Sequence, residues 1–209
     1  QRFPRQARKT ALGLLGAGQM MFLKVVVVVD DDHPVKDLDS LLDALGSKVV
    51  IDKDLIILEG MVADSLAHTS PWENIHDKLI IDATEPAAGD PIKNMENKGA
   101  NESLVISVSA IEGVIQSRML RPSIMVITTE TEGGPKPEIS MEEPNEKLAH
   151  TQRERISEII DSIWNLEASK DLKWLFITDS DANLESEDWK RRLLWQLFCR
   201  FDVGRDLHF

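Results

Sequence analysis

The sequence predicts an α/β fold with a mainly parallel sheet that helices flank on both faces. Short apolar runs alternate along the chain with amphipathic segments of helix length, which is typical of this class. The strands are continuously apolar, as in the five valines of residues 25–29, and such strands are buried on both faces. A chain of 209 residues with 42% hydrophobic residues suffices for one large domain or two small ones.

The boundaries of the elements follow from the same periodicities. Pro4 suits the first turn of a helix, and small and apolar residues at helical spacing extend this helix over residues 4–20. Residues 131–150 lack periodicity and are rich in Gly, Pro and acids, so we expect a linker or surface excursion there. The sequence thus predicts an α/β domain at 22–130 and a helix–strand–helix unit at 151–209 that packs on the same domain. Strands are predicted at 25–29, 55–60, 78–84, 103–109, 123–130 and 173–178, and the other helices at 37–46, 111–120, 151–168 and 188–200.

The first strand and the last share a pattern. Each follows a lysine, continues through five mostly apolar residues, and ends in Asp, one further residue, and Asp, before a third Asp at the next helix start. A duplicated strand–acid–helix unit and a common strand-to-helix turn both explain this match. The matched residues are Lys24 with Lys173, Asp30 with Asp179, Asp32 with Asp181, and Asp39 with Asp188.

The charge balance limits the function classes. Asp and Glu number 36 against 24 Lys and Arg, and this net charge of −12 argues against nucleic acid or an anionic membrane as the main partner. The apolar runs are far shorter than the roughly 20 residues that a transmembrane helix needs. The single cysteine, Cys199, lies in an apolar helix-like run, so we expect a core thiol and a reducing, cytoplasmic location.

Three acids, Asp30, Asp31 and Asp32, follow the first strand at the edge where open α/β sheets bind ligands. Clustered carboxylates can hold a divalent cation. They can also accept backbone N–H groups in a turn and cap the next helix. We favour the turn and expect no metal ligands here.

A signalling receiver domain is the main alternative function. Such phosphoacceptor domains use an acid pair, a strand-end Asp, a small hydroxyl residue and a Lys-Pro. Asp30, Asp31, Asp82, Ser109 and Lys136 would take these places, with the acids holding magnesium and Asp82 attacking a phosphoryl group. This interpretation leaves residues 1–20 and those after 150 without a role.

Three stretches together resemble the UbiD family of decarboxylases. They are FPRQARKTALGLLGAGQMMFLKVVVVVDDD (3–32), LAHTSPWENIHDKLIIDAT (66–84) and LLWQLFCRFDVGRD (193–206). The chain departs from the family pattern at His33-Pro34, at His76-Asp77 and at Glu85-Pro86. The third stretch also follows the second acid cluster instead of the first, which suggests an enlarged C-terminal region in a divergent branch of the family.

The resemblance implies the C-terminal domain of a decarboxylase, joined to an upstream domain by a linking helix over residues 1–21. It implies loss of CO2 from an aromatic or α,β-unsaturated acid in ubiquinone or menaquinone biosynthesis. The implied cofactors are prenylated FMN, supplied by a flavin prenyltransferase, with Mn or Mg and potassium. The catalytic Arg and two Glu, and most cofactor ligands, are expected upstream of Gln1, so the fragment alone should be inactive. The domain would cover the flavin pocket and form much of the contact in a homo-oligomer.

The same resemblance nominates pocket-facing residues. Lys78 could offer a positive charge to a substrate carboxylate, or it could pair with Asp82 or Asp30 at the strand ends. His68 is expected to be a hydrogen-bonded structural histidine. A purely structural oligomerisation domain remains the third possible function. The candidate residues are Asp30, Asp32, His68, Ser70, Lys78, Asp82 and Thr84.

Overall fold

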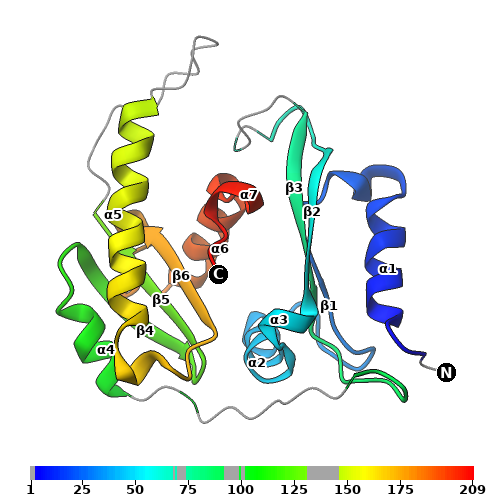
Figure 1. Cartoon of the computed structure of the whole chain (residues 1–209), viewed down its shortest axis with the longest axis horizontal. Helices are drawn as coiled ribbons and strands as arrows, with labels where there is room; N and C mark the ends of the chain where they lie inside the picture. Colours follow the sequence, from blue (N-terminus) through cyan, green and yellow to red (C-terminus); the bar gives the residue numbers. More distant parts are fainter. Residues whose placement is uncertain (1–2, 68, 70–73, 92–98, 100–101, 131–145) are drawn as a thin grey trace. The chain divides into compact units, whose positions relative to one another are not determined.

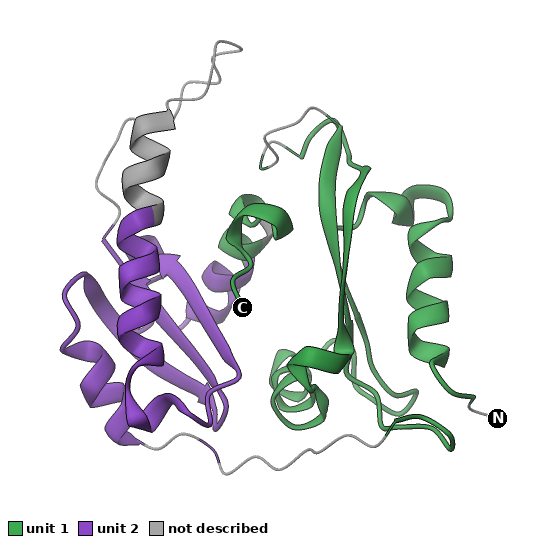
Figure 2. Cartoon of the chain, in the orientation of Figure 1, with its two compact units in different colours: residues 1–97, 195–209 green, residues 98–194 purple. Residues whose placement is uncertain are grey.

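Two three-stranded sheets organise the chain (Figure 1). The computed structural model describes residues 3–67, 69, 74–91, 99, 102–130 and 146–209. The first sheet has the order β1 (Val25–Val28), β3 (Ile75–Asp82), β2 (Leu55–Val62), and the second has the order β4 (Val114–Arg121), β5 (Ile124–Thr129), β6 (Trp174–Asp179). Each sheet belongs to its own compact unit (Figure 2): unit 1 comprises residues 1–97 and 195–209, and unit 2 comprises residues 98–194.

Unit 1 places helices on both sides of its sheet. Helix α1 (Gln6–Leu15) lies on one side, and α2 (Leu38–Lys48) and α3 (Ile51–Asp54) lie on the other (Figure 1). The short helix α7 (Val203–Asp206) packs against β3. Because α1 is amphipathic, its small and apolar face is buried on the sheet. This core contains Ala11, Leu15, Val26 and Ile80, with Val28, Ile56 and Leu58 packed against it.

The helix predicted over residues 4–20 is wrong at its C-terminal end. Helix α1 stops before Gly16, Ala17 is extended, and a 3-10 turn over Gly18–Phe22 leads into β1. Gly18 has a φ of 53°, a left-handed conformation that glycine adopts without steric cost. Gly16 and Gly18 thus lie just beyond the end of the helix, where glycine is favoured.

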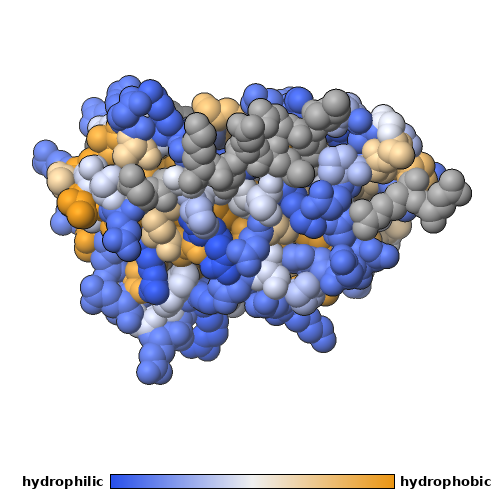
Figure 3. Space-filling view, turned by 90° about the horizontal axis from the view of Figure 1, so that it is seen from below, coloured by the Kyte–Doolittle hydropathy of each residue, from blue (hydrophilic) through white to orange (hydrophobic). Residues whose placement is uncertain are grey.

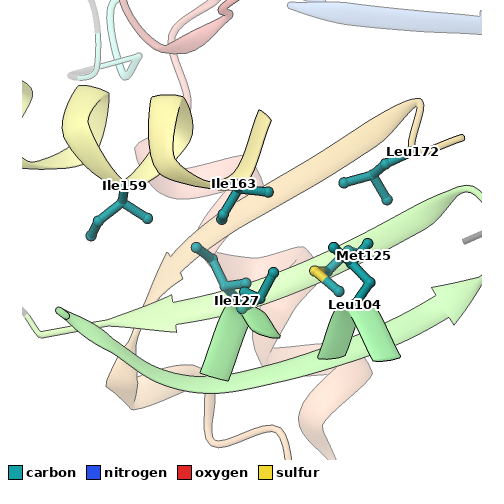
Figure 4. Packing of buried hydrophobic residues seen from close by; sticks show 7 residues of the cluster. Leu104, Met125, Ile127, Ile159, Ile163 and Leu172 are labelled. Carbon is teal, nitrogen blue, oxygen red and sulfur yellow. The ribbon is translucent and has the colours of Figure 1, made fainter. Parts of the chain in front are cut away.

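Unit 2 has a self-contained hydrophobic core. Helix α5 (Glu146–Trp164) lies along the sheet, and Ile159 and Ile163 point from it toward Met125 and Ile127 on β5 (Figure 4). Helix α4 (Glu102–Ser109) adds Leu104 and Val108 to the same cluster. The last long helix, α6 (Trp189–Arg200), begins in unit 2 and ends in unit 1.

Both sheets have the same strand arrangement. The central strand β3 pairs in parallel with β1 and antiparallel with β2, and the central strand β5 pairs in parallel with β6 and antiparallel with β4. The predicted α/β class is confirmed, whereas each sheet is mixed and not mainly parallel. The strands that follow Lys24 and Lys173 are both edge strands parallel to the central strand, in agreement with the sequence match. The duplication itself stays a prediction.

Two neighbouring predictions are wrong. The strand expected at 103–109 is helix α4, and the helix expected at 111–120 is strand β4. As a consequence β4 and β5 form a hairpin that belongs with β6. The units therefore divide the chain differently from the expected domains at 22–130 and 151–209.

The surface is mainly polar on the face shown in Figure 3, where hydrophobic residues appear between hydrophilic ones. Cys199, which was expected in the core, is exposed. Among the described residues, no helix combines the length and the apolar character needed to cross a membrane.

Candidate functional site

Asp30 and Asp82 lie at one edge of the first sheet. The parallel register pairs Val28 with Asp82, so the carboxyl ends of β1 and β3 coincide. Both aspartates are buried, with exposed fractions of 6% each. This is the edge at which open α/β sheets bind ligands, and the sequence predicted its acidic character.

Asp30 is engaged by neighbours on two sides. Its Oδ2 atom accepts a hydrogen bond of 2.6 Å from Nζ of Lys48 and one of 3.2 Å from the backbone nitrogen of Glu85. Lys48 also lies 3.4 Å from the Glu85 carboxylate. The hydrogen bond to Asp30 raises the pKa of Lys48. The group thus ties the end of β1 to the last turn of α2 and to the segment after β3.

Asp82 builds a turn. Its Oδ1 atom accepts hydrogen bonds from the backbone nitrogen of Thr84 at 3.2 Å and from the Thr84 hydroxyl at 2.6 Å. An aspartate that holds the residue two positions later is a common turn device. Asp31 and Asp32, in contrast, are exposed. Of the three consecutive acids, Asp30 alone turns into the protein.

The hollow beside this edge is small, and charged or polar residues make up most of its lining. It encloses about 280 Å³, open solvent included, whereas ligand pockets usually enclose about 300 to 1,000 Å³ and are mostly apolar. A flavin therefore does not fit it. The described residues also contain no group of three or more His, Cys, Asp or Glu side chains arranged to hold a metal ion. The lining residues are Arg5, Lys53, Asp54, Asp82, Thr84, Pro86, Asp90 and Pro91.

Lys78 does not face this hollow or a carboxylate. Its side chain is fully buried, and its Nζ atom donates hydrogen bonds to the carbonyl oxygens of Met21 at 2.6 Å, Leu23 at 2.9 Å and Val62 at 2.9 Å. Desolvation by burial lowers the pKa of Lys78. The structure thus contradicts the expected ion pair with Asp82 or Asp30, because all three ammonium protons are directed to backbone carbonyls.

A second polar cluster lies around Thr69. Nζ of Lys24 donates to the Thr69 hydroxyl at 2.7 Å, and Nη1 of Arg205 donates to the Thr69 carbonyl at 3.1 Å. Each of the three residues comes from a different one of the stretches 3–32, 66–84 and 193–206. From the sequence, Lys24 and Arg205 are only parts of the stretches that resemble the family, and their shared contact with Thr69 was not predicted. The nominated residues His68 and Ser70 lie outside the described residues, as does Lys136 of the receiver interpretation.

The receiver interpretation loses part of its site. Asp30 and Asp82 do share a sheet edge, but Ser109 ends helix α4 in unit 2 instead of ending the strand expected at 103–109. Its expected place depended on the strand that is in fact α4.

Comparison with known proteins connects unit 1 to a family. Residues 1–83 match the model of the 3-octaprenyl-4-hydroxybenzoate carboxy-lyase C-terminal domain. An uncharacterised protein of Archaeoglobus fulgidus is 39% identical over 85 residues, which cover 41% of this chain and 18% of that protein. One of Aquifex aeolicus is 40% identical over 84 residues, covering 40% of this chain and 17% of that protein. The chain matches less than a fifth of the length of these curated relatives.

Solved structures show a partial likeness. Vanillic acid decarboxylase of Sedimentibacter hydroxybenzoicus, in its open form, has 29% identity and a TM-score of 0.43, covering 48% of this chain and 22% of that one. The UbiD-class enzyme HmfF from Pelotomaculum thermopropionicum, solved in complex with FMN, has 23% identity and a TM-score of 0.39. The match covers 46% of this chain and 21% of that one. TM-scores below 0.5 add no weight, so the assignment depends on the family match. By that match, residues 1–83 of this chain are similar to the C-terminal domain of the UbiD carboxy-lyase family.

Proposed function

We propose that this chain supplies the C-terminal domain of a UbiD-type decarboxylase that releases CO2 from an aromatic or α,β-unsaturated acid. The observation that carries the proposal is the family match over residues 1–83. A second observation supports it: unit 1 brings Lys24, Thr69 and Arg205 together, one from each stretch that resembles the family. Residues far apart in sequence that converge in this way indicate that the three stretches form one domain.

The catalytic Arg and two Glu, with the ligands of prenylated FMN, Mn or Mg and potassium, would belong to a domain upstream of Gln1. The small size of the hollow near Asp82 supports this division, because a flavin does not fit it. The domain would instead cover the flavin pocket and contribute to a homo-oligomer. A flavin prenyltransferase would supply the cofactor, and the setting would be cytoplasmic quinone biosynthesis.

Within this role, we assign the carboxyl edge of the first sheet to the side of the domain that would face the flavin pocket. Asp30 and Asp82 shape that edge through their turns, and Thr84 and Asp32 lie beside them in sequence. Lys78 serves the interior of the domain instead, as its carbonyl partners show.

The direct experiment compares two proteins. The polypeptide extended upstream of Gln1 is produced together with a flavin prenyltransferase, and CO2 release is measured from a panel of benzoic, hydroxybenzoic and cinnamic acids. The chain of residues 1–209, produced in the same way, is the matched control. We expect turnover of at least one acid by the extended protein and none by the control. Turnover by the control, or a flavin-loaded extended protein that decarboxylates no member of the panel, would contradict the proposal.

A receiver-like phosphoacceptor remains a second candidate because Asp30 and Asp82 share one sheet edge. It is tested by incubating the chain with acetyl phosphate and magnesium and searching for an acid-labile phosphoaspartate by mass spectrometry. Phosphorylation at Asp82 that an Asp82→Asn substitution removes would favour this candidate over the decarboxylase.

A purely structural oligomerisation domain is the third candidate. If the domain has only this role, Asp30→Asn and Thr84→Val leave the turnover of the extended protein unchanged.

A further inference from the structure

The chain leaves unit 1 after residue 97 and returns to it at residue 195. We infer that the returning segment 200–206 is a strap that closes the domain begun by residues 3–91, and that residues 98–194 form an inserted module that unfolds independently of that domain. The inference goes beyond the proposed function, because it concerns how the domain is assembled and not what it catalyses.

The strap is fastened to the start of the domain by charged donors. Nζ of Lys24 donates to the carbonyl oxygen of Phe201 at 3.2 Å, across 177 residues of sequence. The same ammonium donates to the Thr69 hydroxyl, and Arg205 donates to the Thr69 carbonyl across 136 residues. Thr69 is therefore held from both ends of the chain at once. Hydrogen bonds from charged donors are roughly twice as strong as neutral ones, so this junction is suited to hold two distant segments together.

The strap is also organised internally. Asp202 caps α7 by accepting from the backbone nitrogen of Arg205 at 3.1 Å, and Asp206 accepts from the backbone nitrogen of Asp202 at 2.8 Å. The Arg205 guanidinium forms two bonds of 2.6 Å to Asp206 and one of 2.7 Å to the carbonyl of Arg200. The guanidinium is thus oriented before it reaches Thr69, which reduces the entropy lost when the strap docks.

The strap fits closely against β3. Val203 is 2% exposed and Asp202 is 4% exposed, so the turn is buried. A Cβ atom at Gly204 would lie 2.3 Å from Oδ2 of Asp77, so a side chain there would require the Asp77 carboxylate to move. Burial of this kind makes the strap a part of the domain's interior and not a loose tail.

The module between the two halves has a core of its own. The buried side chains of this core come from α4, β5, α5 and the segment before β6 (Figure 4). They are Leu104, Val108, Met125, Ile127, Ile159, Ile163 and Leu172, all within residues 98–194. A contiguous segment with its own sheet and core meets the usual definition of a domain.

Hydrogen exchange of the full chain tests both parts of the inference. In an Arg205→Met variant we expect amides of β1 and β3 to exchange at least about tenfold faster, because charged hydrogen bonds contribute to the local opening free energy. The exchange rates of the amides of β5 and of residues 154–164 should change by less than about twofold. Arg191→Met, at an exposed position of α6, is the matched control and should leave all four segments unchanged.

The reciprocal variant is Ile163→Ala in the core of the module. It should accelerate exchange in β5 and leave β1, β3 and 203–206 within about twofold of the parent chain. If Arg205→Met proves too unstable to handle, Lys24→Met removes the other fastening and carries the same expectation. Equal acceleration of both units by either variant would overturn the independent module, and unchanged exchange of β1 and β3 in both strap variants would overturn the strap.

Discussion

The ammonium of Lys78 lies 2.6 Å from the carbonyl oxygen of Met21, in the 3-10 turn that precedes β1. Two more carbonyls, of Leu23 and Val62, complete its hydrogen bonds at 2.9 Å each. One buried side chain on the central strand thereby fixes the entry to β1 and the end of β2. A residue that the sequence nominated for substrate binding is instead an internal brace of the sheet.

Replacement of this brace should be costly. Lys78→Met keeps much of the side-chain volume but leaves three carbonyls without their donor. We expect a loss of about 2–4 kcal/mol in the free energy of unfolding of unit 1, since unsatisfied buried acceptors cost about 1–3 kcal/mol each and some regain water. Urea unfolding measures it, with Lys170→Met as the control because Lys170 is exposed. A loss no larger than that of the control would contradict the brace.

A rise in pH in the alkaline range should change the contributions of Lys78 and Lys48 to the free energy of unfolding in opposite directions. Burial lowers the pKa of Lys78 below 10.5, so between its folded pKa and 10.5 the unfolded chain binds more protons, and stability from this group rises with pH. The hydrogen bond to Asp30 raises the pKa of Lys48 above 10.5, so its contribution is present below 10.5 and is lost as pH rises through the folded pKa. The difference in unfolding free energy between the parent chain and Lys78→Met should therefore increase as pH approaches 10.5. Urea titrations at several alkaline pH values measure this difference, and a flat or falling trend would refute the assignment.

Asp30 and Asp32 should respond differently to the same substitution. Asp30→Asn removes the charge that binds Lys48 and weakens the bond to the Glu85 backbone, so we expect a loss of about 1–3 kcal/mol in the unfolding free energy. Asp32→Asn, at an exposed position, should change it by less than about 0.5 kcal/mol. Chemical denaturation of both variants compares them, and equal effects would show that burial does not distinguish the two acids.

The strands with β-branched apolar runs were predictable, and the segment 103–121 was not. The run LVISVS has strong strand propensity, yet Leu104 and Val108 are one helical turn apart and are both buried in the core of unit 2. Packing therefore overrides propensity there. In β4 the apolar residues happen to recur at helical spacing, while Pro122 and Ser123 make the short hairpin connection to β5. That connection was the available signal for a strand pair.

The sequence predicted where the residues of the candidate site lie, but not which residues they contact. The sequence placed Asp30 and Asp82 at one sheet edge correctly, because parallel strands align their carboxyl ends. It could not show that Lys48 binds Asp30, since that contact depends on where α2 ends relative to β1. It also could not show that Lys78 points inward. A strand that is buried on both faces lacks the alternation of apolar and polar residues that would assign a lysine to one face.

Gly204 should tolerate alanine only when Asp77 is absent. In the parent chain, Gly204→Ala places a methyl group against the Asp77 carboxylate, whose Oδ1 atom accepts from the Gly60 backbone nitrogen at 2.9 Å. We expect a loss of about 1–2 kcal/mol in the unfolding free energy. With Asp77→Ala in place, the same substitution should be neutral or stabilising by up to about 1 kcal/mol, because alanine favours the helix over glycine. A double-mutant cycle by urea unfolding measures the coupling. Equal effects of Gly204→Ala in both backgrounds would show that the strap does not press on β3 at this point.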